Sequence, residues 1–529
     1  MNLIDPARRA LRHALLACAL VAAAGCTTIS TAPDPLKTPP KANESVAVVS
    51  ITGNTAQVTA MDVASVTRLN ADGSSSGSIF NLTQVAPGLA RDTSLFVGVL
   101  PAGAYEFSGL SNRATNQSLR MTPTMRQRIG RFTIVPGTPT DLGRLIMTPV
   151  NTNVVVGRCA TITSNLPMMQ RFAPEQAQRF AGTTPGGWDG MRTSNDLVEE
   201  YARLRPVGAD NMVELSDGRV VAASRLGSLL IRSTEGHWRV LPSTGLESLL
   251  HVTPVDRPDA SLVAAGEFST LLRLPPGGDR LVPIDTGDLP PGNLLFVDGN
   301  DRTGWYIAEQ SGTEVTLFKS PRLVAGTWTP VRKESVANSF WSGANSFWIW
   351  RAPQGLTYAL STGQIQSLDY ASGIWRTTTA PNNSRIVTIE YHPGGSLGIV
   401  TSPGGGFAGV FASLYLSKDM GANWREIKSD FNVKVAPPYE TLGGTLLNPG
   451  GVFTDQVLEA SDDGGKTWKK RGDFPLAWHL VQLPSGKTFA VDRGQLGLFS
   501  IRSSTDEGAN WKTEYSNFDA KAYESSQKK

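Results

Sequence analysis

The C-terminal part of the chain, from about residue 209 onward, alternates short apolar runs with turns rich in Gly, Asp and Asn. VELSDGRVVAASRLGSLLIRSTEGHW, which ends at Trp238, contains an apolar run, a Gly turn, a second run, another turn and a third run. VQLPSGKTFAVDRGQLGLFSIRSSTDEGANW, which ends at Trp511, repeats this order. Apolar runs this short between turn residues predict β-strands. With the strand after each Trp, every unit is predicted to hold four antiparallel strands.

The spacing of these units predicts their number. Aligning them on the closing residue gives Trp238, a unit without Trp near Leu281, Trp328, Trp375, Trp424, Trp468 and Trp511. The Trp spacings of 90, 47, 49, 44 and 43 residues fit one unit of about 45 residues, with two units in the first interval. A four-stranded unit cannot bury both of its faces alone, whereas a ring of such units can. Residues 209–516 are therefore predicted to form a seven-bladed β-propeller.

The preceding part of the chain is also predicted to be mostly β-structure. From residue 45 to 150, runs such as SVAVVSITG, TSLFVGVLP and RIGRFTIVPG lie between Gly, Pro and Asn turns, which predicts a small β-sandwich. Residues 151–208 are interpreted as a connector with short helices at APEQAQRFA and SNDLVEEYARL, and residues 517–529 as a polar tail. The predicted fold class is all-β: a small N-terminal β-sandwich followed by a seven-bladed propeller of four-stranded antiparallel blades.

The first 25 residues have the pattern of an export signal. Arg8, Arg9 and Arg12 precede an apolar run, Ala14 to Ala24, that is too short to span a bilayer. Residues 26–44 are polar and rich in Pro and are interpreted as a flexible tether. Ordinary secretion, with cleavage after a small residue, remains an alternative.

Composition and charge narrow the functional classes. The 529 residues are 40% apolar and 18% charged, and the 53 Gly and 34 Pro favour many short elements joined by turns. The net charge of +3 falls to +1 without the signal, and no basic block stands out, so no nucleic acid partner is expected. Cys159 is expected to be a small buried apolar residue, because no His is near it in sequence.

One phrase, Ser-x-Asp-x-Gly-x-x-Trp, occurs three times. The Asp side chains can accept hydrogen bonds from turn amides, the Gly residues permit positive φ, and the Trp rings are expected to be buried against neighbouring strands. One or two acids in each turn are too few for calcium, so no metal site is predicted. The residues concerned are Ser417, Asp419, Gly421 and Trp424; Ser461, Asp463, Gly465 and Trp468; and Ser504, Asp506, Gly508 and Trp511.

Three resemblances add expectations to this interpretation. AAGC, ending at Cys26, resembles the lipobox of bacterial lipoproteins, which implies lipidation of Cys26, and Thr27 in place of Asp implies the outer membrane, facing periplasm or surface. The repeated phrase resembles the Asp-box, or bacterial neuraminidase repeat, of sialidases and other propellers, which implies turns on the rim away from the usual ligand mouth. LPAGAYEF and FTIVPGTPTDLGRLIMTP resemble transthyretin-like and carboxypeptidase-regulatory-like sandwiches.

The residues do not supply the catalytic pattern that the sialidase resemblance implies. Sialidases use three arginines, a Tyr and Glu pair and a Phe-Arg-Ile-Pro motif, and this last motif is absent here. Glu390 and Tyr391 are adjacent, so on a strand they point to opposite faces. The four histidines after the signal lack metal-ligand spacing, and no cofactor fingerprint is present. A two-carboxylate glycoside hydrolase leaves no linear signature and stays open as the alternative.

Binding is the favoured function. In NSFWSGANSFWIWR, Trp341 is the best candidate for an exposed ring, although the aromatic residues of this stretch are more easily explained as filling between blades. Arg385 and Lys434 lie in loops predicted to line the propeller mouth. Photosystem II assembly factors of the lipoprotein type are similar in joining a membrane anchor to an Asp-box propeller, which implies a scaffold role. The prediction is a lipid-anchored envelope protein that binds another envelope protein or a glycan.

Overall fold

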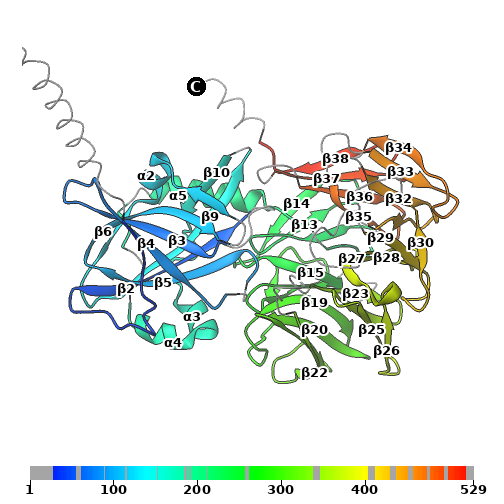
Figure 1. The fold of residues 1–529 in the computed structure, drawn as a ribbon, viewed down its shortest axis with the longest axis horizontal. Helices are drawn as coiled ribbons and strands as arrows, with labels where there is room; N and C mark the ends of the chain where they lie inside the picture. Colours follow the sequence, from blue (N-terminus) through cyan, green and yellow to red (C-terminus); the bar gives the residue numbers. More distant parts are fainter. Residues whose placement is uncertain are drawn as a thin grey trace, which may run out of the picture.

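A computed structural model describes most of the chain from residue 28 onward (Figure 1). The described residues are 28–54, 61–87, 90–113, 116–151, 153–183, 187–189, 192–209, 211–255, 261–336, 346–402, 412–428, 437–450, 457–473, 477–493 and 498–519. They form a curled N-terminal sheet followed by seven four-stranded sheets. The predicted all-β fold class is confirmed. None of the helices within the described residues is long and apolar enough to cross a membrane.

The N-terminal sheet has ten strands in the order β10-β9-β2-β5-β4-β3-β6-β7, with β1 paired to β4 and β8 paired to β6. The sheet curls around one core that includes Val49, Phe96, Tyr105, Phe132 and Leu145 from five different strands. The predicted sandwich therefore takes the form of one continuous sheet. Its strands are β1 Thr28–Thr31, β2 Glu44–Gly53, β3 Val63–Leu69, β4 Ser75–Val85, β5 Thr93–Pro101, β6 Gly103–Asn112, β7 Gln117–Arg120, β8 Arg131–Ile134, β9 Thr140–Val150 and β10 Asn153–Arg158.

Short helices cover parts of this sheet. Alternate residues of β2 and β5 point away from the core, and Val48 and Val97 pack there against Met169 and Phe180. α5 lies along β9 and β10. The helices are α2 Pro123–Ile129, α3 Leu166–Phe172, α4 Pro174–Ala177, the 3₁₀ turn η1 Gln178–Phe180 and α5 Arg192–Leu204. Two of them, α4 and α5, lie in the segments whose sequence predicts short helices.

The interpretation of residues 26–44 as a flexible tether is wrong from Thr28 onward. β1 pairs in parallel with β4, Thr28 opposite Ser78, and Ala32 is fully buried. The reason lies in the neighbouring strand: β5 pairs with β4 only from Thr83 to Val85, so the upstream edge of β4 is open to another strand. Composition typical of a linker gives no sign of such an edge.

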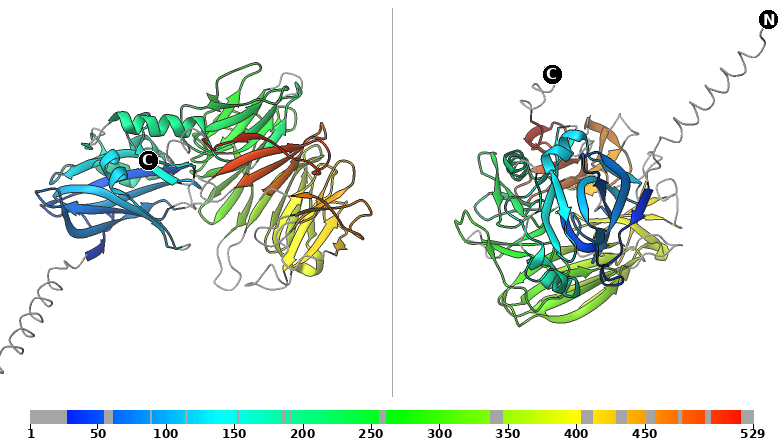
Figure 2. Two further views of the ribbon diagram at one scale, coloured as in Figure 1. Left: turned by 90° about the horizontal axis from the view of Figure 1, so that it is seen from above. Right: turned by 90° about the vertical axis from the view of Figure 1, so that its left-hand side faces the viewer.

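Seven sheets of four consecutive antiparallel strands form the propeller, and Figure 2 shows them arranged around a common centre. In blades 1 to 4 the first strands of neighbouring blades contact each other, which places these strands nearest the axis. Blades 1 to 3 are β11 Met212–Glu214, β12 Val220–Ala223, β13 Ser228–Arg232 and β14 Trp238–Pro242; β15 Leu249–Pro254, β16 Leu262–Gly266, β17 Leu271–Leu274 and β18 Val282–Pro283; and β19 Asn293–Asn300, β20 Gly304–Ser311, β21 Glu314–Ser320 and β22 Thr329–Ser335.

The last four blades follow the same order. They are β23 Phe347–Ala352, β24 Gly355–Leu360, β25 Gln364–Asp369 and β26 Trp375–Thr379; β27 Arg385–Tyr391, β28 Leu397–Ser402, β29 Ser413–Ser417 and β30 Arg425–Ile427; β31 Tyr439–Glu440, β32 Leu446–Gly450, β33 Val457–Ser461 and β34 Lys469–Asp473; and β35 Ala477–Gln482, β36 Thr488–Arg493, β37 Phe499–Ser504 and β38 Lys512–Ser516, with the 3₁₀ turn η2 Pro381–Asn383 before β27. In blade 2, Leu281 is buried at the position where other blades carry Trp.

The propeller has two faces that differ in their connections. Because strands alternate in direction, turns between first and second and between third and fourth strands lie on one face, here called the turn face. Turns between second and third strands and the blade-to-blade connections lie on the other, the connection face. The N-terminal sheet docks on the connection face of blades 1 and 2, where Asp92 pairs with Arg225 at 3.2 Å and Arg144 pairs with Glu247 at 2.9 Å.

The core of this junction is apolar. Cys159 packs with Ile146 and Ala202 from the N-terminal part and with Leu226 and Leu246 from blade 1. Burial raises the pKa of the Cys159 thiol, which is therefore neutral at physiological pH. The sequence-based expectation of a small buried apolar residue at this position is confirmed.

The ring closes through side chains, because each blade consists of four consecutive strands. Glu514 of blade 7 accepts bonds from Arg232 at 2.6 and 3.0 Å and from Trp238 Nε1 at 3.1 Å, both in blade 1. Its side chain is 4% exposed and that of Arg232 is 8% exposed. Burial alone would raise the pKa of Glu514, but hydrogen bonds from Arg232, Ser503 and Trp238 lower it to about 2. The carboxylate is therefore charged and joins the first blade to the last.

Replacing Glu514 by Gln should destabilise the propeller at neutral pH by about 3 kcal/mol, because Arg232 is left buried without a counter-ion. The pKa of Glu514 is lowered on folding, so its contribution is complete above the ordinary value near 4.5 and is lost as the pH falls toward 2. Urea unfolding of the wild type and Glu514→Gln, at about pH 7 and about pH 3, should show a difference that shrinks at the lower pH.

The matched control is Glu314→Gln, which removes an exposed pair with Lys333 and should cost less than about 1 kcal/mol. Equal effects of the two substitutions would show that the seam between blades 1 and 7 does not depend on Glu514.

Candidate functional site

The three Ser-Asp-Gly-Trp turns share one hydrogen-bonding pattern. In the first, Ser417 Oγ donates to Asp419 Oδ1 at 2.8 Å and accepts from the amide of Gly421 at 2.8 Å. The other two turns repeat both bonds. Each Asp also accepts bonds from the end of its own turn, and such a bond from Asn510 lowers the pKa of Asp506 to about 2. Each carboxylate is therefore charged and committed to its own turn.

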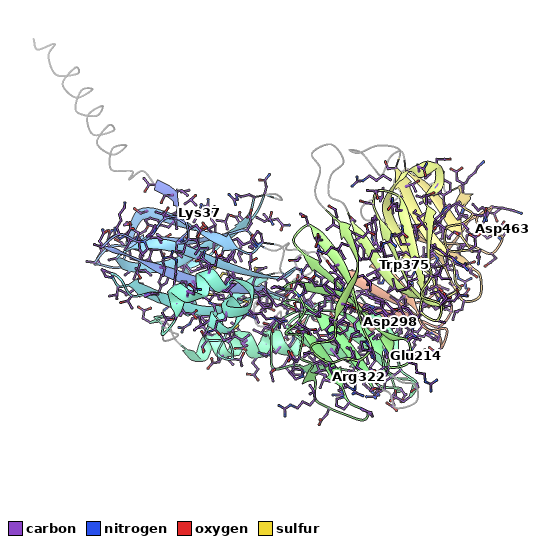
Figure 3. All side chains as sticks on the ribbon, turned by 90° about the horizontal axis from the view of Figure 1, so that it is seen from below. Lys37, Glu214, Asp298, Arg322, Trp375 and Asp463 are labelled. Carbon is purple, nitrogen blue, oxygen red and sulfur yellow. The ribbon has the colours of Figure 1, made fainter. Side chains whose placement is uncertain are left out.

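These aspartates do not gather around a cavity. Figure 3 shows Asp463 at the end of the propeller far from Lys37 of the N-terminal part and away from Asp298. The carboxylates of Asp419, Asp463 and Asp506 bond side chains and amides no more than four residues away. The geometry of each turn fixes a backbone corner on the turn face and leaves no shared acid site.

Each Trp that follows such a turn packs on the preceding blade. Trp424 Nε1 donates to the carbonyl oxygen of Thr379 in blade 4, and Trp468 Nε1 donates to that of Lys428 in blade 5, both at 2.9 Å. Trp511 packs in a cluster with Leu458 of blade 6. The phrase therefore joins neighbouring blades as well as closing a hairpin.

The Gly residues permit this close approach. Gly421, Gly465 and Gly508 have φ of 86°, 88° and 86°, in the left-handed region. A Cβ at Gly421 would lie 2.8 Å from Thr378 Oγ1 of blade 4, and one at Gly508 would overlap Leu458 of blade 6. Position and conformation both require Gly.

Only one of the three residues predicted to bind a ligand lies among the described residues. Arg385 opens β27 opposite Ser402 and is partly buried. Trp341, Lys434 and the lipidation candidate Cys26 lie outside the described residues. Ligand binding by the loops on the connection face, which the sequence predicts, stays a prediction.

Titratable groups near the axis hold blades together. Asp298 accepts from Tyr370 at 3.0 Å and from Arg351 at 3.3 Å, which ties blade 3 to blade 4. Burial lowers the pKa of both His251 and His392 to about 3, so both rings are neutral. No cluster of three or more His, Cys, Asp or Glu that could hold a metal occurs in the part of the chain that the structure describes.

The side chains of Glu390 and Tyr391 point to opposite faces of β27, as their adjacent positions on a strand require. The Tyr391 ring stacks on Trp350 at 6.4 Å between blades 4 and 5. Burial raises the pKa of Glu390, while His479 of blade 7 lowers it by a smaller amount. Glu390 thus points toward the axis and Tyr391 into the interface, so the two do not form a catalytic pair.

A groove between blades 4 and 5 is the candidate binding site on the propeller. It has a volume of about 450 Å³ and lies on the turn face, where turns from both blades line it. Pro353, Leu368, Ile374, Tyr391 and Met420 supply apolar surface, and Ile374 is 59% exposed. Sequence reasoning missed this groove because four separate turns build it.

The groove also has a defined charge. Arg376 and Lys418 lie at it, together with Asp369 and Asp419. The two carboxylates accept bonds from the amides of their own turns, which satisfies part of their capacity. Lys418 pairs with Glu440, and hydrogen bonds within the Asp369 turn, helped by the charge of Arg376, lower the pKa of Asp369. Arg376 is therefore the groove cation that no side-chain hydrogen bond or close ion pair among the described residues holds.

One sequence signal does point to the groove. Met420 occupies the position where the other two turns carry Gly464 and Glu507, and its φ of 56° lies in the left-handed region. The φ of this position is positive in all three turns, 75° at Gly464 and 53° at Glu507, so the turn sets the conformation and the apolar side chain is what differs at Met420.

No protein-family model and no curated protein matches the chain. Solved structures do. YCF48 from Cyanidioschyzon merolae is 14% identical over 54% of this chain and 93% of its own, with a TM-score of 0.41. A catalytically inactive virginiamycin B lyase from Staphylococcus aureus is 13% identical over 58% and 94%, with a TM-score of 0.37. A chain of the mitotic checkpoint complex is 13% identical over 59% and 90%, with a TM-score of 0.37. The propeller assignment rests on strand pairing.

Replacing Gly508 by Ala should destabilise the propeller by about 3 kcal/mol, because strain at positive φ adds to overlap with Leu458 of the preceding blade. Gly486→Ala in the same blade is the matched control. Its φ is 85° but a Cβ there meets nothing within 4 Å, so only the conformational cost of about 1 kcal/mol is expected. Thermal unfolding of both variants measures the difference, and equal losses would show that blade contact adds nothing.

Proposed function

We propose that the protein is an exported, lipid-anchored scaffold of the cell envelope that binds a partner protein through the groove between blades 4 and 5. The observation that carries this proposal is the groove itself: apolar side chains from four turns meet in one exposed hollow with a cation at its edge. Pockets with this mixture of apolar walls and few polar groups suit an apolar side chain presented by a partner.

The construction of the groove supports a binding role. Its walls are strands and tight turns of two blades, and Thr378 Oγ1 of blade 4 donates to the carbonyl oxygen of Met420 in blade 5 at 3.0 Å. A preformed site loses little conformational entropy on binding. Arg376 favours a partner segment that carries an acidic residue next to its apolar one.

The N-terminus supports the envelope location. The export signal, followed by Cys26 in a lipobox-like sequence, is the pattern of a lipoprotein, and Thr27 favours the outer membrane.

Binding is tested by immobilising the protein, incubating it with envelope extracts and cross-linking it to the proteins that bind. Ile374→Asp or Met420→Asp places a charge in the apolar groove, and each should reduce recovery of the partner about tenfold or more. Val331→Asp is the control, because Val331 is 43% exposed on blade 3, away from the groove. Partners recovered equally with all variants would contradict the groove as the binding site.

The anchor is tested separately. Cys26→Ala should move the protein from the membrane fraction to the soluble fraction, and mass spectrometry of the wild type should find an acylated N-terminal Cys26. A mature N-terminus without lipid would overturn the anchor and leave the groove untouched.

A glycoside hydrolase is the second candidate, and the raised pKa of Glu390 is the observation that favours it. Burial raises the pKa of this carboxyl group, and a raised carboxyl pKa is what a general acid requires. The scaffold proposal expects no turnover of a panel of fluorogenic glycosides. Turnover that Glu390→Gln abolishes would replace the scaffold with a hydrolase.

A further inference from the structure

The start of β1 fixes which end of the N-terminal sheet faces the proposed anchor. Thr28 is two residues after Cys26, and two extended residues span at most about 7 Å. β1 runs parallel to β4 with Thr28 opposite Ser78, so its beginning points to the same end of the sheet as Ser75 and the β3–β4 turn. A lipid on Cys26 would therefore hold this end of the sheet against the membrane.

A row of paired residues crosses the sheet at this end. Ile29 pairs with Ile79, Ile79 with Thr67, Thr67 with Glu106, and Glu106 with Arg131. Directly paired residues share a face, and four strand spacings of about 4.8 Å place Arg131 about 19 Å from Ile29 along the sheet. Ile29 is 67% exposed. The face thus has an apolar side chain beside the anchor and a cation at the other end.

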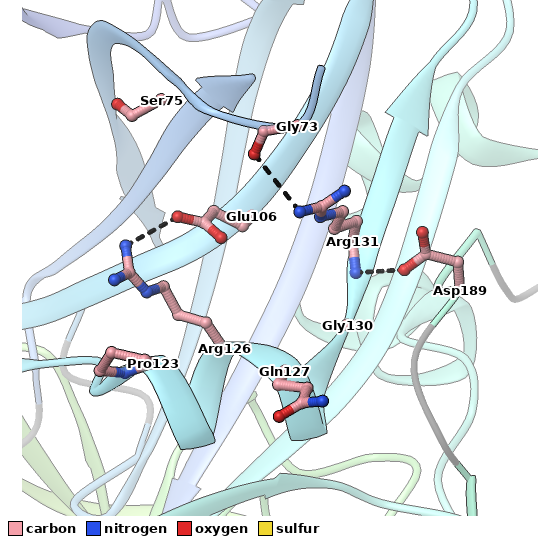
Figure 4. A pocket seen from close by; sticks show the side chains of 9 residues that line it. All are labelled: Gly73, Ser75, Glu106, Pro123, Arg126, Gln127, Gly130, Arg131 and Asp189. Atoms are coloured by element: carbon pink, nitrogen blue, oxygen red, sulfur yellow. Dashed lines mark hydrogen bonds and ion pairs between the residues drawn. The ribbon is translucent and has the colours of Figure 1, made fainter. Parts of the chain in front are cut away.

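Arg131 belongs to a cavity of about 640 Å³ on this face (Figure 4). Arg126 pairs there with Glu106 at 2.8 Å, and the carboxylate of Asp189 accepts the backbone amide of Arg131 at 2.5 Å. The Arg131 guanidinium donates to the neutral carbonyl oxygen of Gly73 at 3.3 Å and forms no ion pair with a described residue. Its charge is therefore left available to an anion in the cavity.

Gly73 makes this placement possible. A Cβ at Gly73 would lie 2.8 Å from one terminal nitrogen of Arg131, so a larger residue would displace the guanidinium from the turn.

Charge is divided unevenly between the two parts of the mature chain. Residues 28–158, which form the sheet, contain eleven Arg and Lys against seven Asp and Glu, a net charge of +4. Residues 159–529 contain 35 and 38, a net charge of −3. The positive part is the one that carries the anchor, and a negatively charged lipid surface attracts it.

We propose that this end of the sheet lies on the membrane surface and that the cavity of Arg126 and Arg131 takes the phosphate of an anionic phospholipid headgroup. The orientation rests on the proposed lipid anchor at Cys26. The headgroup site rests on the cavity and its charge. Ile29 enters the interface beside the anchor, and Arg131 pairs with a phosphate beyond it.

Vesicle flotation of the exported Cys26→Ala chain tests the site without the acyl chain. Vesicles containing phosphatidylglycerol should bind the protein better than vesicles of phosphatidylcholine alone. Adding Arg131→Gln should weaken binding to the anionic vesicles about fivefold, the loss expected for one cation at such a surface. Arg219→Gln is the control, because Arg219 lies on blade 1 and pairs with Asp217. Thermal unfolding checks that both variants remain folded.

The outcomes separate the competing explanations. Equal binding to both vesicle types, or no effect of Arg131→Gln, overturns the headgroup site. Saturable binding of inorganic phosphate without preference for anionic vesicles also overturns it, in favour of a small-anion site. Because no variant in this experiment is acylated, these results stand whether or not Cys26 is lipidated in the cell.

Discussion

Packing of each blade on the one before it is the contact on which the whole propeller depends. A four-stranded sheet has two apolar faces and can cover neither by itself, so every blade needs a neighbour on each side. The Trp before or at the start of the outer strand supplies much of this contact, as Trp328, Trp375 and Trp424 show in clusters shared with the preceding blade. In blades 5 to 7 the hydrogen bonds of the Ser-Asp-Gly turn fix the corner that precedes the Trp, and the Gly lets the two blades approach.

The same contact explains how the ring closes. No strand is shared between blade 1 and blade 7, so Trp238 must pack on blade 7 as other Trp residues pack on their predecessors, and its ring lies 6.1 Å from that of Phe489. The acceptor of its N–H differs: Trp424 donates to a backbone carbonyl, whereas Trp238 donates to the carboxylate of Glu514. A charge replaces a carbonyl at the one interface where chain connectivity does not keep the two blades together. Blade 1 is also held by the N-terminal sheet through Arg225 and Asp92.

The regular spacing of the repeats made most of the propeller predictable from the sequence. The groove between blades 4 and 5 was not predictable, because it depends on the three-dimensional arrangement of separate turns. The seven units follow from the spacing of the repeats, because every blade must bury the same two faces against its neighbours. This holds even for the blade in which Leu281 takes the place of Trp. β1 was not predictable, because a strand of only four residues, with Ile29 as its one apolar side chain, joins an open edge of β4 that the sequence does not reveal. The groove was missed for a similar reason: Pro353, Ile374 and Met420 come from different turns, and only the fold places them together. Trp341 and Lys434 lie outside the described residues and remain predictions.

The two proposed surfaces are compatible within one molecule. The N-terminal sheet occupies the connection face of blades 1 and 2, while the groove opens on the turn face between blades 4 and 5. A partner in the groove therefore does not compete with the junction between the two parts. The end that is proposed to face the membrane, at the start of β1 and the β3–β4 turn, belongs to the N-terminal sheet and not to the propeller. The proposed anchor, two residues before a paired strand, would restrict the sheet. The buried ion pairs of the junction would carry that restriction to the propeller, so a partner would meet the groove in a limited range of orientations.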